Sequence, residues 1–474
     1  MNILIIDVGS SSIRALLFDY ESALISQPIA RHDYQFNPDA TCDAHQLRQL
    51  VESCVDEILA QSSHPIQAVG MTTFVGNVLG VDDKNQPLTP LYTYAHNQAS
   101  ESAKILINLV DNEAVHQRTG CRIHTAYHPA KLNWLKTIQP DLFSQVTQWI
   151  DFATYCYREW FGHDVPCSYS IASWSGLFNR YTNTWDLEWQ KLLGLSEYHL
   201  PNLADYDNIQ QGLVLPYANR WASLKSTPFY LGIGDGAGAN IGSGGLTPNQ
   251  PVLTVGTTAA MRIITPSIMN IPSPLWSYRV DKNHHLVGGS TNEGGNIFAW
   301  AKNTLNLTSD TIEAQLTTHT DAPHGLIALP LFNGERSPYF NESAQGTIHG
   351  ITTQTTSLDI IRALLEGVAL RLRIILNAMN TPCDFVLAGG GALHQSPAWA
   401  QIFADVLERR LYTFSERETS AYGTFLLIRY GGIPHIPQAN KYDKQFFPRP
   451  EYTSYYADLA EKQNLLYQQL YRKG

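Results

Sequence analysis

The 474-residue sequence has no long uncharged apolar run, no concentration of positive charge and no paired cysteines. A membrane-spanning helix needs about 20 predominantly apolar residues, so the first absence argues against one. The net charge of −10, without a basic cluster, argues against nucleic acid or an anionic membrane as a partner. The six cysteines are scattered without a CxxC pair, which favours reduced thiols over a zinc site or a disulfide framework. Because no basic segment and apolar core precede the first strand, we expect a cytoplasmic protein.

What the sequence does contain is a repeated turn. IDVGSSS at residues 6–12 recurs in altered form as LTVGTTA at residues 253–259, each time at the end of an apolar, β-branched run. Each copy predicts a hairpin, with a buried strand, a tight reversal at the glycine and a return strand. One such hairpin would mean little, since Gly–Ser turns are common, but the internal repeat indicates a phosphate clamp with two lobes.

The tips of both hairpins carry hydroxyl and backbone N–H groups that can donate hydrogen bonds to phosphate oxygens. The copies differ at one position, where the first has Asp7 and the second has Thr254. A single carboxylate beside phosphate-binding donors suits a Mg²⁺ ion that bridges to a nucleotide, so we predict Asp7 as the metal-associated residue. The predicted phosphate-binding residues are Ser10, Ser11 and Ser12 in the first copy, and Gly256, Thr257 and Thr258 in the second.

A glycine cluster at residues 234–245 resembles a motif for dinucleotide binding. Its first six residues, GDGAGA, fit the loosest form of the dinucleotide-binding fingerprint. That fingerprint needs an acidic residue about 20 positions later to hold the ribose, and none lies between Asp235 and Asp281. Asp235 itself remains of interest, because a carboxylate in a loop with few side chains allows close approach of a ligand. It is either a catalytic group or the cap of a helix that begins at Gly236.

Three segments have clear secondary-structure signals. Residues 43–61 and 356–379 have helical spacing, the second with a capping box formed by Thr356 and Asp359. Residues 69–94 predict two strands around an Asp-Asp-Lys-Asn turn.

A second glycine run at residues 389–391 leads into another predicted helix, with Ser396 as its N-cap and Pro397 at its first position. No low-complexity linker marks a domain boundary, so the repeated hairpin sets it. We predict an N-terminal lobe over residues 1–245 and a C-terminal lobe over residues 246–474.

The combined motifs resemble a known family. Phosphate binding without GxxxxGK[ST] excludes the P-loop design. The paired hairpins resemble the actin-like ATPase fold, an α/β architecture in which two ribonuclease-H-like lobes close on ATP around a catalytic cleft. Within that fold, essentially the whole chain resembles the FGGY carbohydrate kinases, with gluconate kinases as the most similar branch and xylulose kinases next. The resemblance is carried by DVGSSSIR (7–14), TGCRIHTAYHPAKLNWLK (119–136), YSIASWSGLFNRYTNTWD (169–186), GDGAGANIGSGG (234–245), VLTVGTTAAMRI (252–263), GGSTNEGGNIFAW (288–300), LPLFNGERSPYFNESAQGTIHGI (329–351), ALLEGVALRL (363–372), AGGGALHQSPAWAQIFADVL (388–407) and SAYGTFLLIRYGGI (420–433).

The resemblance implies roles for the residues singled out above. Asp235 falls where the family keeps its general base, and Asp7 falls on the Mg²⁺-associated position. Glu335 and Arg336 reproduce a family pattern that we interpret as a structural pair between the lobes. The remaining matches imply that Ser10, Ser11 and Thr257 hold the β- and γ-phosphates of ATP, with Ser12, Gly256 and Thr258 beside them, and that Gly389, Gly390 and Gly391 let the adenosine lie against bare backbone.

The sugar pocket is where the sequence departs from the family. Val75 and Gly76 stand where gluconate and xylulose kinases usually carry Met-His, and YAHNQ at residues 94–98 replaces their Trp-x-Asp-x-Arg. We therefore expect Val75, Gly76 and His96 to line a rebuilt pocket together with Asp235.

A further group, His124, Tyr127 and Lys131, keeps the pattern of the gluconate kinases. These side chains either meet a substrate carboxylate or form a cluster at a helix start with Lys131 in solvent.

Two functions stay open. The first is ATP-dependent phosphorylation of a hydroxyl on a sugar or sugar acid, gluconate-like or pentulose-like, with Mg²⁺. The second is a catalytically idle actin-like sensor of sugar or nucleotide. Retention of Asp7, Asp235 and both phosphate turns favours the enzyme. The expected partner is a small-molecule sugar or sugar acid, with neither nucleic acid nor a membrane, and a homodimer is the one assembly left open.

Overall fold

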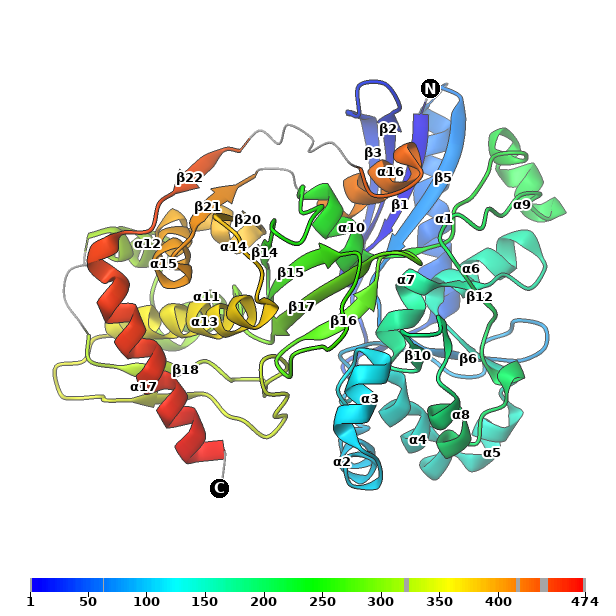
Figure 1. Cartoon of the computed structure of the whole chain (residues 1–474). Coiled ribbons are helices and arrows are strands. Elements are labelled where there is room, and N and C mark those ends of the chain that lie inside the picture. Colours follow the sequence, from blue (N-terminus) through cyan, green and yellow to red (C-terminus); the bar gives the residue numbers. More distant parts are fainter. Residues whose placement is uncertain (1, 63, 319–323, 415–417, 435–441, 472–474) are drawn as a thin grey trace.

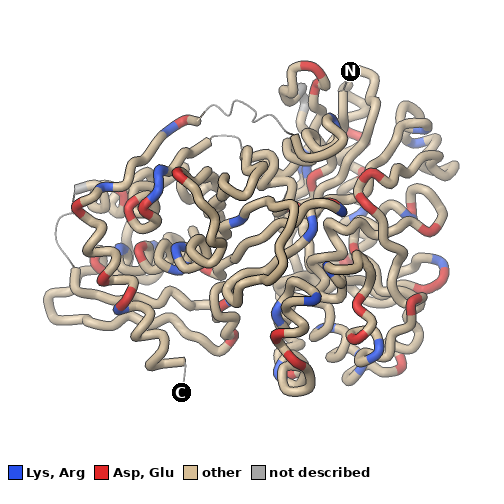
Figure 2. The backbone as a smooth tube through the Cα atoms, viewed as in Figure 1, with Lys and Arg blue, Asp and Glu red and all other residues tan. Residues whose placement is uncertain are grey.

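The computed structural model describes residues 2–62, 64–318, 324–414, 418–434 and 442–471. Two α/β lobes lie side by side, with the N-terminus on one and the C-terminus on the other (Figure 1). Acidic and basic residues are interspersed along both lobes (Figure 2). No helix within these ranges is long and apolar enough to cross a membrane.

The N-terminal lobe is built on a five-stranded sheet with strand order β13-β5-β1-β2-β3. The central strand β1 pairs antiparallel with β2 and parallel with β5. Every residue of β1 is buried, which explains its almost wholly apolar sequence and makes Asp7 an exception. The strands are β1 Asn2–Val8, β2 Ser12–Asp19, β3 Ile25–Asp33, β5 Ile66–Thr73 and β13 Ile233–Gly234.

The C-terminal lobe repeats this arrangement in a seven-stranded sheet with strand order β16-β17-β15-β14-β20-β21-β22. Its central strand β14 pairs antiparallel with β15 and parallel with β20, as β1 does with β2 and β5. The sequence repeat is therefore a repeat of sheet topology, and the prediction of two lobes of one fold is confirmed. The strands are β14 Val252–Val255, β15 Ala259–Thr265, β16 Trp276–Arg279, β17 His285–Thr291, β20 Phe385–Gly389, β21 Arg410–Thr413 and β22 Lys444–Phe446.

The three predicted helices form, and two of them, α13 and α15, begin at the caps that the sequence predicts. Helix α1 (Ala44–Gln61) has Asp43 as its N-cap, and α13 (Ser357–Met379) has the capping box of Thr356 and Asp359. Helix α15 (Pro397–Leu407) begins after Ser396, whose hydroxyl accepts the N–H of Trp399. Local hydrogen bonds between residues three apart fix these starts, so they can be read directly from the sequence.

The expectation for residues 69–94 is only half correct. The chain does reverse at Asp82, whose N–H donates to the Gln86 carbonyl. The strand before it, β6 (Leu79–Val81), instead pairs with β8 (Gln148–Ile150), and β7 (Leu91–Tyr92) pairs with β4 (Thr41–Cys42). The two arms of the reversal meet at two isolated bridges, Val81 to Pro87 and Val78 to Tyr92, and in the second each N–H donates to the other residue's carbonyl at 2.9 Å. A continuous ladder does not form between them, and Pro87 has no N–H to contribute to one.

Helix α16 (Thr419–Tyr430) lies between β21 and β22 of the C-terminal sheet in sequence but packs on the N-terminal lobe (Figure 1). It lies against β1, β5 and α10 (Asp235–Gly242), and Phe425 stacks on Phe18 of β2 with ring centroids 4.8 Å apart. Residues of α16 therefore contribute to the core beside the N-terminal sheet, and the division at residue 245 stays a prediction.

Shorter elements surround the two sheets. In the N-terminal half these are α2 Ser100–Leu109, α3 Asn112–Thr119, α4 His128–Ile138, α5 Pro140–Gln145, α6 Phe152–Phe161, α7 Tyr169–Ala172, α8 Leu187–Leu193, α9 Leu215–Arg220, β9 Cys167–Ser168, β10 Phe178–Asn179, β11 Thr184–Trp185 and β12 Leu203–Ala204. In the C-terminal half they are α11 Asn296–Leu305, α12 Ser309–Thr318, α14 Gly391–Gln395, α17 Thr453–Tyr471, β18 Ile327–Leu329 and β19 Thr347–His349. Single 3₁₀ turns occur at Ser173–Ser175, Glu197–His199, Ala222–Leu224 and Pro450–Tyr452.

Candidate active site

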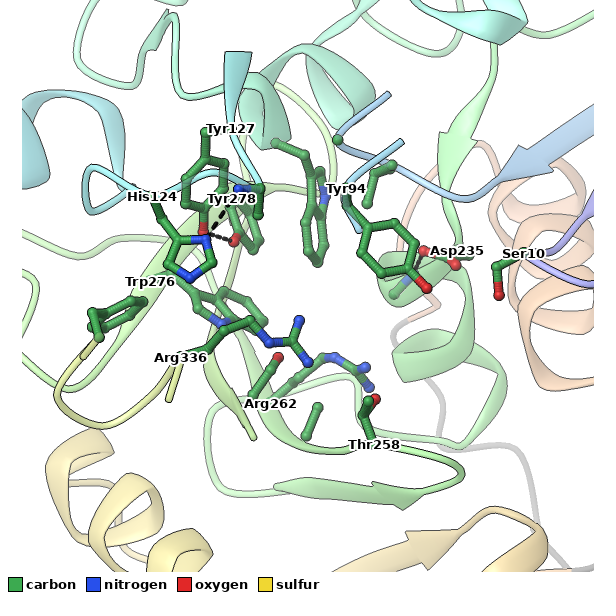
Figure 3. A pocket seen from close by; sticks show the side chains of 18 residues that line it. Ser10, Tyr94, His124, Tyr127, Asp235, Thr258, Arg262, Trp276, Tyr278 and Arg336 are labelled. Carbon is green, nitrogen blue, oxygen red and sulfur yellow. Dashed lines mark hydrogen bonds between the residues drawn. The ribbon is translucent and has the colours of Figure 1, made fainter. Parts of the chain in front are cut away.

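A cavity of about 160 Å³ lies where the two lobes meet. Asp235 and Ser10 lie at one end, His124 lies at the other, and Arg262 and Arg336 lie between them (Figure 3). The complete lining is Ser10, Val75, Gly76, Tyr94, His124, Ala126, Tyr127, Trp174, Asp235, Gly236, Thr258, Ala260, Arg262, Trp276, Tyr278, Ser290, Arg336 and Phe340.

The two repeated turns face this region but differ by one residue. In the first turn the Gly9 N–H donates to the Ser12 carbonyl, and in the second the Gly256 N–H donates to the Thr258 carbonyl, both at 2.9 Å. Ser10 therefore lies at the tip of the longer turn and lines the cavity, as Thr258 does from the other lobe.

Ser11 and Ser12 do not reach the cavity. Ser11 is exposed at the tip of the turn, whereas Ser12 is the first residue of β2 and is only 3% exposed. Of the three serines in the first turn, only Ser10 thus faces the space between the lobes.

A second cavity of about 400 Å³ lies behind the turn of the C-terminal lobe. Gly256 and Thr257 line it, together with residues of α11 and α12 and the start of α14. Because Thr258 lines the first cavity, this turn separates the two spaces.

The glycines at 389–391 divide between packing and binding. A Cβ atom on Gly389 would lie 2.6 Å from the Phe414 ring, and one on Gly390, whose φ is +102°, would lie 2.3 Å from the Val255 carbonyl oxygen. Only Gly391 has open space around it and lines the second cavity. The first two positions therefore need glycine so that β20 can lie close to its neighbours.

Asp235 is the first residue of α10 rather than its cap. The N-cap is Gly234, and the Asp235 Oδ1 accepts the N–H of Gly236 at 2.7 Å. The expected helix start at Gly236 is thus one residue late. Burial raises the pKa of Asp235 to about 6, although the nearby Arg262 guanidinium opposes this rise.

Asp7 lies at the end of β1 and is 4% exposed. Its Oδ2 lies 3.4 Å from Nη1 of Arg14, the residue opposite it on β2. Burial raises the pKa of Asp7 to about 7, with Arg14 lowering it and the nearby carboxylates of Glu418 and Asp235 raising it. The two predicted carboxylates are therefore close enough to influence each other across the site.

His96 does not line the cavity, contrary to our expectation. Its ring is 1% exposed and packs against Tyr92 and Trp134, with centroids 5.0 Å from each. Tyr94, two residues earlier, faces the cavity instead, together with Val75 and Gly76.

His124 and Tyr127 line the cavity, but their polar atoms are already engaged. His124 Nδ1 accepts the N–H of Ala126 at 3.0 Å, which leaves the proton on Nε2, 3.2 Å from the Glu342 carboxylate. The Tyr127 hydroxyl lies 2.6 Å from the Tyr278 hydroxyl. These two side chains therefore shape the far end of the cavity.

Lys131 neither faces the cavity, where it could meet a substrate carboxylate, nor lies in solvent. It is fully buried, with its ammonium donating to the Thr125 carbonyl at 2.6 Å. Burial lowers the pKa of Lys131 to about 7.

Arg262 and Arg336 also line the cavity, and the sequence analysis placed neither of them there. Arg336 donates through Nε to Asn292 Oδ1 at 2.8 Å, and Arg262 donates to Thr254 Oγ1 at 3.3 Å. The expected pair of Glu335 with Arg336 does not form, because Glu335 is buried and pairs with Arg371 of α13. The sequence marked Arg336 but could not show that its side chain turns toward the cavity.

An aromatic wall closes one side of the cavity. The rings of Trp174 and Tyr278 stack at 3.6 Å with an interplanar angle of 19°, and Trp276 lies 4.3 Å from Tyr278. Trp174 comes from the N-terminal lobe and the other two from β16, so the wall itself joins the lobes. Such a surface suits the C–H faces of a sugar.

Nothing resembling a complete metal site is preformed. Within the described ranges no group of three or more His, Cys, Asp or Glu side chains could hold an ion. Mg²⁺ bound with a nucleotide usually takes one or two carboxylates from the protein and fills its other positions with phosphate oxygens and water.

Comparison with known proteins agrees with this geometry. The chain is similar to the gluconokinase of Bacillus subtilis (strain 168), with 25% identity over 448 residues, covering 90% of this chain and 86% of that protein. It is also 21% identical to the xylulose kinase of Lactococcus lactis over 98% of this chain and 96% of that protein.

Solved structures give the same result. A ligand-bound xylulose kinase from Lactobacillus acidophilus superposes with a TM-score of 0.91 and 25% identity, covering 100% of this chain and 99% of that one. A gluconate kinase from the same organism also gives 0.91 and 25%, covering 99% and 98%.

Family models match both halves. The N-terminal domain of the FGGY family of carbohydrate kinases matches residues 2–242, and its C-terminal domain matches residues 252–430. With two ribonuclease-H-like lobes, a cavity between them and these matches over most of its length, the chain belongs to the FGGY family of carbohydrate kinases.

Proposed function

We propose that this carbohydrate kinase transfers the terminal phosphoryl group of ATP to a hydroxyl of a sugar acid. The observation that carries the proposal is the turn that separates the two cavities. Gly256 and Thr257 face one cavity, and Thr258 faces the other, which also holds Asp235. A nucleotide in the cavity lined by Gly256 and Thr257 would thus present its terminal phosphate, across a row of N–H and hydroxyl donors, to an acceptor beside Asp235 in the other cavity.

The chemistry assigned to each residue follows from this arrangement. Asp235 accepts the proton of the attacking hydroxyl, whose oxygen bonds to the terminal phosphorus while ADP leaves. Ser10 and Thr258 approach the transferred group from opposite lobes and donate hydrogen bonds to its oxygens. Because Gly391 has no side chain and has open space around it, the nucleotide can lie directly against its backbone.

Asp7 is the residue we assign to Mg²⁺. When bound, the ion would neutralise phosphate charge and fix the phosphate chain for in-line transfer. The local charges fit a cation, because two carboxylates, Asp7 and Glu418, lie beside the guanidinium of Arg14.

The choice of a sugar acid rests on the charges in the acceptor cavity. Its lining includes two guanidinium groups, Arg262 and Arg336, but one carboxylate, Asp235. A neutral sugar would leave this positive excess unpaired, whereas a carboxylate can take both N–H donors of one guanidinium. The gluconokinase and gluconate kinase relatives support the same class.

A pentulose is the second candidate. It is favoured by the xylulose kinase relatives. Val75 and Gly76 favour neither candidate, since they leave the pocket without the Met-His of either branch. The idle-sensor alternative gains no support, since Asp235, Ser10 and Thr258 converge on one cavity.

We further propose a cytoplasmic enzyme, because its six cysteines are all unpaired thiols and ATP is a cytosolic substrate. A homodimer remains a prediction, which size-exclusion chromatography with light scattering would test.

The acceptor class is tested by comparing aldonates with ketopentoses in an ADP-release assay, using wild type and Arg336→Gln. Losing one partly buried guanidinium should lower kcat/KM for aldonates about 10- to 100-fold and leave ketopentoses nearly unchanged. Arg31→Gln is the matched control, since Arg31 is 53% exposed and pairs with Asp33 at the surface. Equal losses on both classes would contradict the sugar-acid assignment.

A further inference from the structure

Glu418 reaches the first phosphate turn from a distant part of the chain. Its Oε2 lies 3.0 Å from Nη1 of Arg14, whereas the Asp7 Oδ2 lies 3.4 Å from the same nitrogen. One guanidinium nitrogen is thus shared between two carboxylates, and the closer one belongs to residue 418. Neither the repeat nor the cavity lining accounts for this contact.

The sheet alone would place Arg14 on Asp7. The two residues are direct partners in the antiparallel pair of β1 and β2, so their side chains lie on the same face. Without a competing anion, an Arg–Asp pair at this register would form two hydrogen bonds and occupy both carboxylate oxygens. In the structure Arg14 Nη1 instead donates one long hydrogen bond to Asp7 Oδ2, at 3.4 Å, and lies closer to Glu418, at 3.0 Å.

Helix packing fixes the position of Glu418. It is the N-cap residue of α16, yet its side chain does not cap that helix. The α16 backbone lies directly on α10, because a Cβ atom on Gly423 would come within 1.8 Å of the Gly238 carbonyl oxygen, and one on Gly242 within 2.0 Å of the Thr419 oxygen. The start of α16 is therefore held rigidly beside the helix that carries Asp235.

We propose that Glu418 is a positioning residue that holds the Arg14 guanidinium away from Asp7, so that Asp7 keeps an oxygen available for the Mg²⁺ of the nucleotide. This inference rests on the function proposed above, in which Asp7 is the metal-associated residue. It adds a residue that touches neither substrate nor metal and acts only through Arg14.

The test is Glu418→Gln, which removes the charge and keeps the shape of the side chain. Arg14 should then close on Asp7, and the free Mg²⁺ concentration that gives half-maximal ATP binding should rise about tenfold. Calorimetric titration of ATP at graded Mg²⁺, without any sugar, measures this independently of catalysis.

A double variant separates positioning from structure. In Arg14→Gln/Glu418→Gln the Arg14 guanidinium can no longer cover Asp7, so the Mg²⁺ requirement should return to the wild-type value or below it. The matched control is Glu408→Gln, at the C-terminal end of α15, where the carboxylate pairs with Arg373. That control should leave the Mg²⁺ requirement unchanged.

Two results would overturn the inference. If Glu418→Gln lowers the melting temperature but not the Mg²⁺ dependence, Glu418 only stabilises α16. If Arg14→Gln alone raises the Mg²⁺ requirement as Glu418→Gln does, Arg14 binds the nucleotide and is not held off Asp7.

Asp7→Asn distinguishes this failure from that of the proposed function. An unchanged Mg²⁺ requirement in that variant removes Asp7 from metal binding and the proposed role with it. A raised requirement in Asp7→Asn, but not in Glu418→Gln, overturns only the positioning role.

Discussion

At the scale of single residues, burial sets the acid–base properties of the cleft. It raises the pKa of Asp235 to about 6 and that of Asp7 to about 7, and lowers that of His128 to about 3. In each case the neutral form is favoured because the charged group loses its hydration. Asp235 has a pKa close to neutral pH, which suits a group that must accept a proton and later release it.

Replacing Asp235 by Asn should separate catalysis from stability. Turnover should fall by about 10²- to 10⁴-fold, because proton acceptance is lost while size and the hydrogen bond to Gly236 are kept. The free energy of unfolding near pH 7.5 should rise by about 1–2 kcal/mol, since the variant no longer holds a carboxylate in a partly buried site. Coupled ADP assays and urea denaturation measure the two effects.

The contribution of Asp235 to stability and to turnover also depends on pH. The folded-state pKa of Asp235, about 6, lies above the ordinary value of 3.8, so its contribution to stability is lost as pH rises through that range. The stability gain of Asp235→Asn should accordingly shrink toward pH 4. In the wild type, kcat/KM should fall below about pH 6 as Asp235 is protonated. Full turnover in the Asn variant would return Asp235 to a structural role.

At the scale of elements, close backbone approach decides where glycine is required. The chain turns sharply after β20, where Gly390 has φ +102° and contacts Val255 of the neighbouring strand. One residue later Gly391 begins α14 and faces open space. The sequence alone does not distinguish the two glycines, but only position 390 requires glycine for its backbone conformation and close contact.

Gly390→Ala should destabilise the protein, whereas Gly391→Ala should not. The added methyl at 390 meets backbone in a conformation that L-residues rarely adopt, which should cost about 2–4 kcal/mol. At 391 the same methyl enters the nucleotide cavity and should raise KM for ATP at most a few-fold. Denaturation midpoints and ATP kinetics check both, and equal midpoints would contradict the strain at Gly390.

At the scale of the whole molecule, the lobes are tied together on the side of the acceptor cavity. Arg180 is 3% exposed and donates to the carbonyl of Gln117 in its own lobe and to those of Ile268 and Met269 in the other. The Tyr127–Tyr278 hydroxyl contact spans the same boundary. We infer that this side acts as the fixed edge of the cleft.

Arg180→Ala should weaken this connection between the lobes. Three carbonyl oxygens lose a charged donor whose side chain is itself buried, so the free energy of unfolding should fall by about 2–4 kcal/mol. Arg31→Ala, at an exposed ion pair, is the control and should change stability by less than about 0.5 kcal/mol. Urea denaturation of both variants measures the difference, and matching curves would show that Arg180 does not hold the lobes together.

The sequence by itself determined the two hairpins, the caps of α13 and α15, the glycine loop with Asp235 and the kinase family. These features depend on residues within a few positions of one another, so their signals are local. Only the tertiary structure decided that His96 and Lys131 are buried, that Arg336 faces the cavity and that Glu418 meets Arg14. Contacts between residues hundreds of positions apart depend on how α16 and the second lobe pack, and no local pattern encodes that packing.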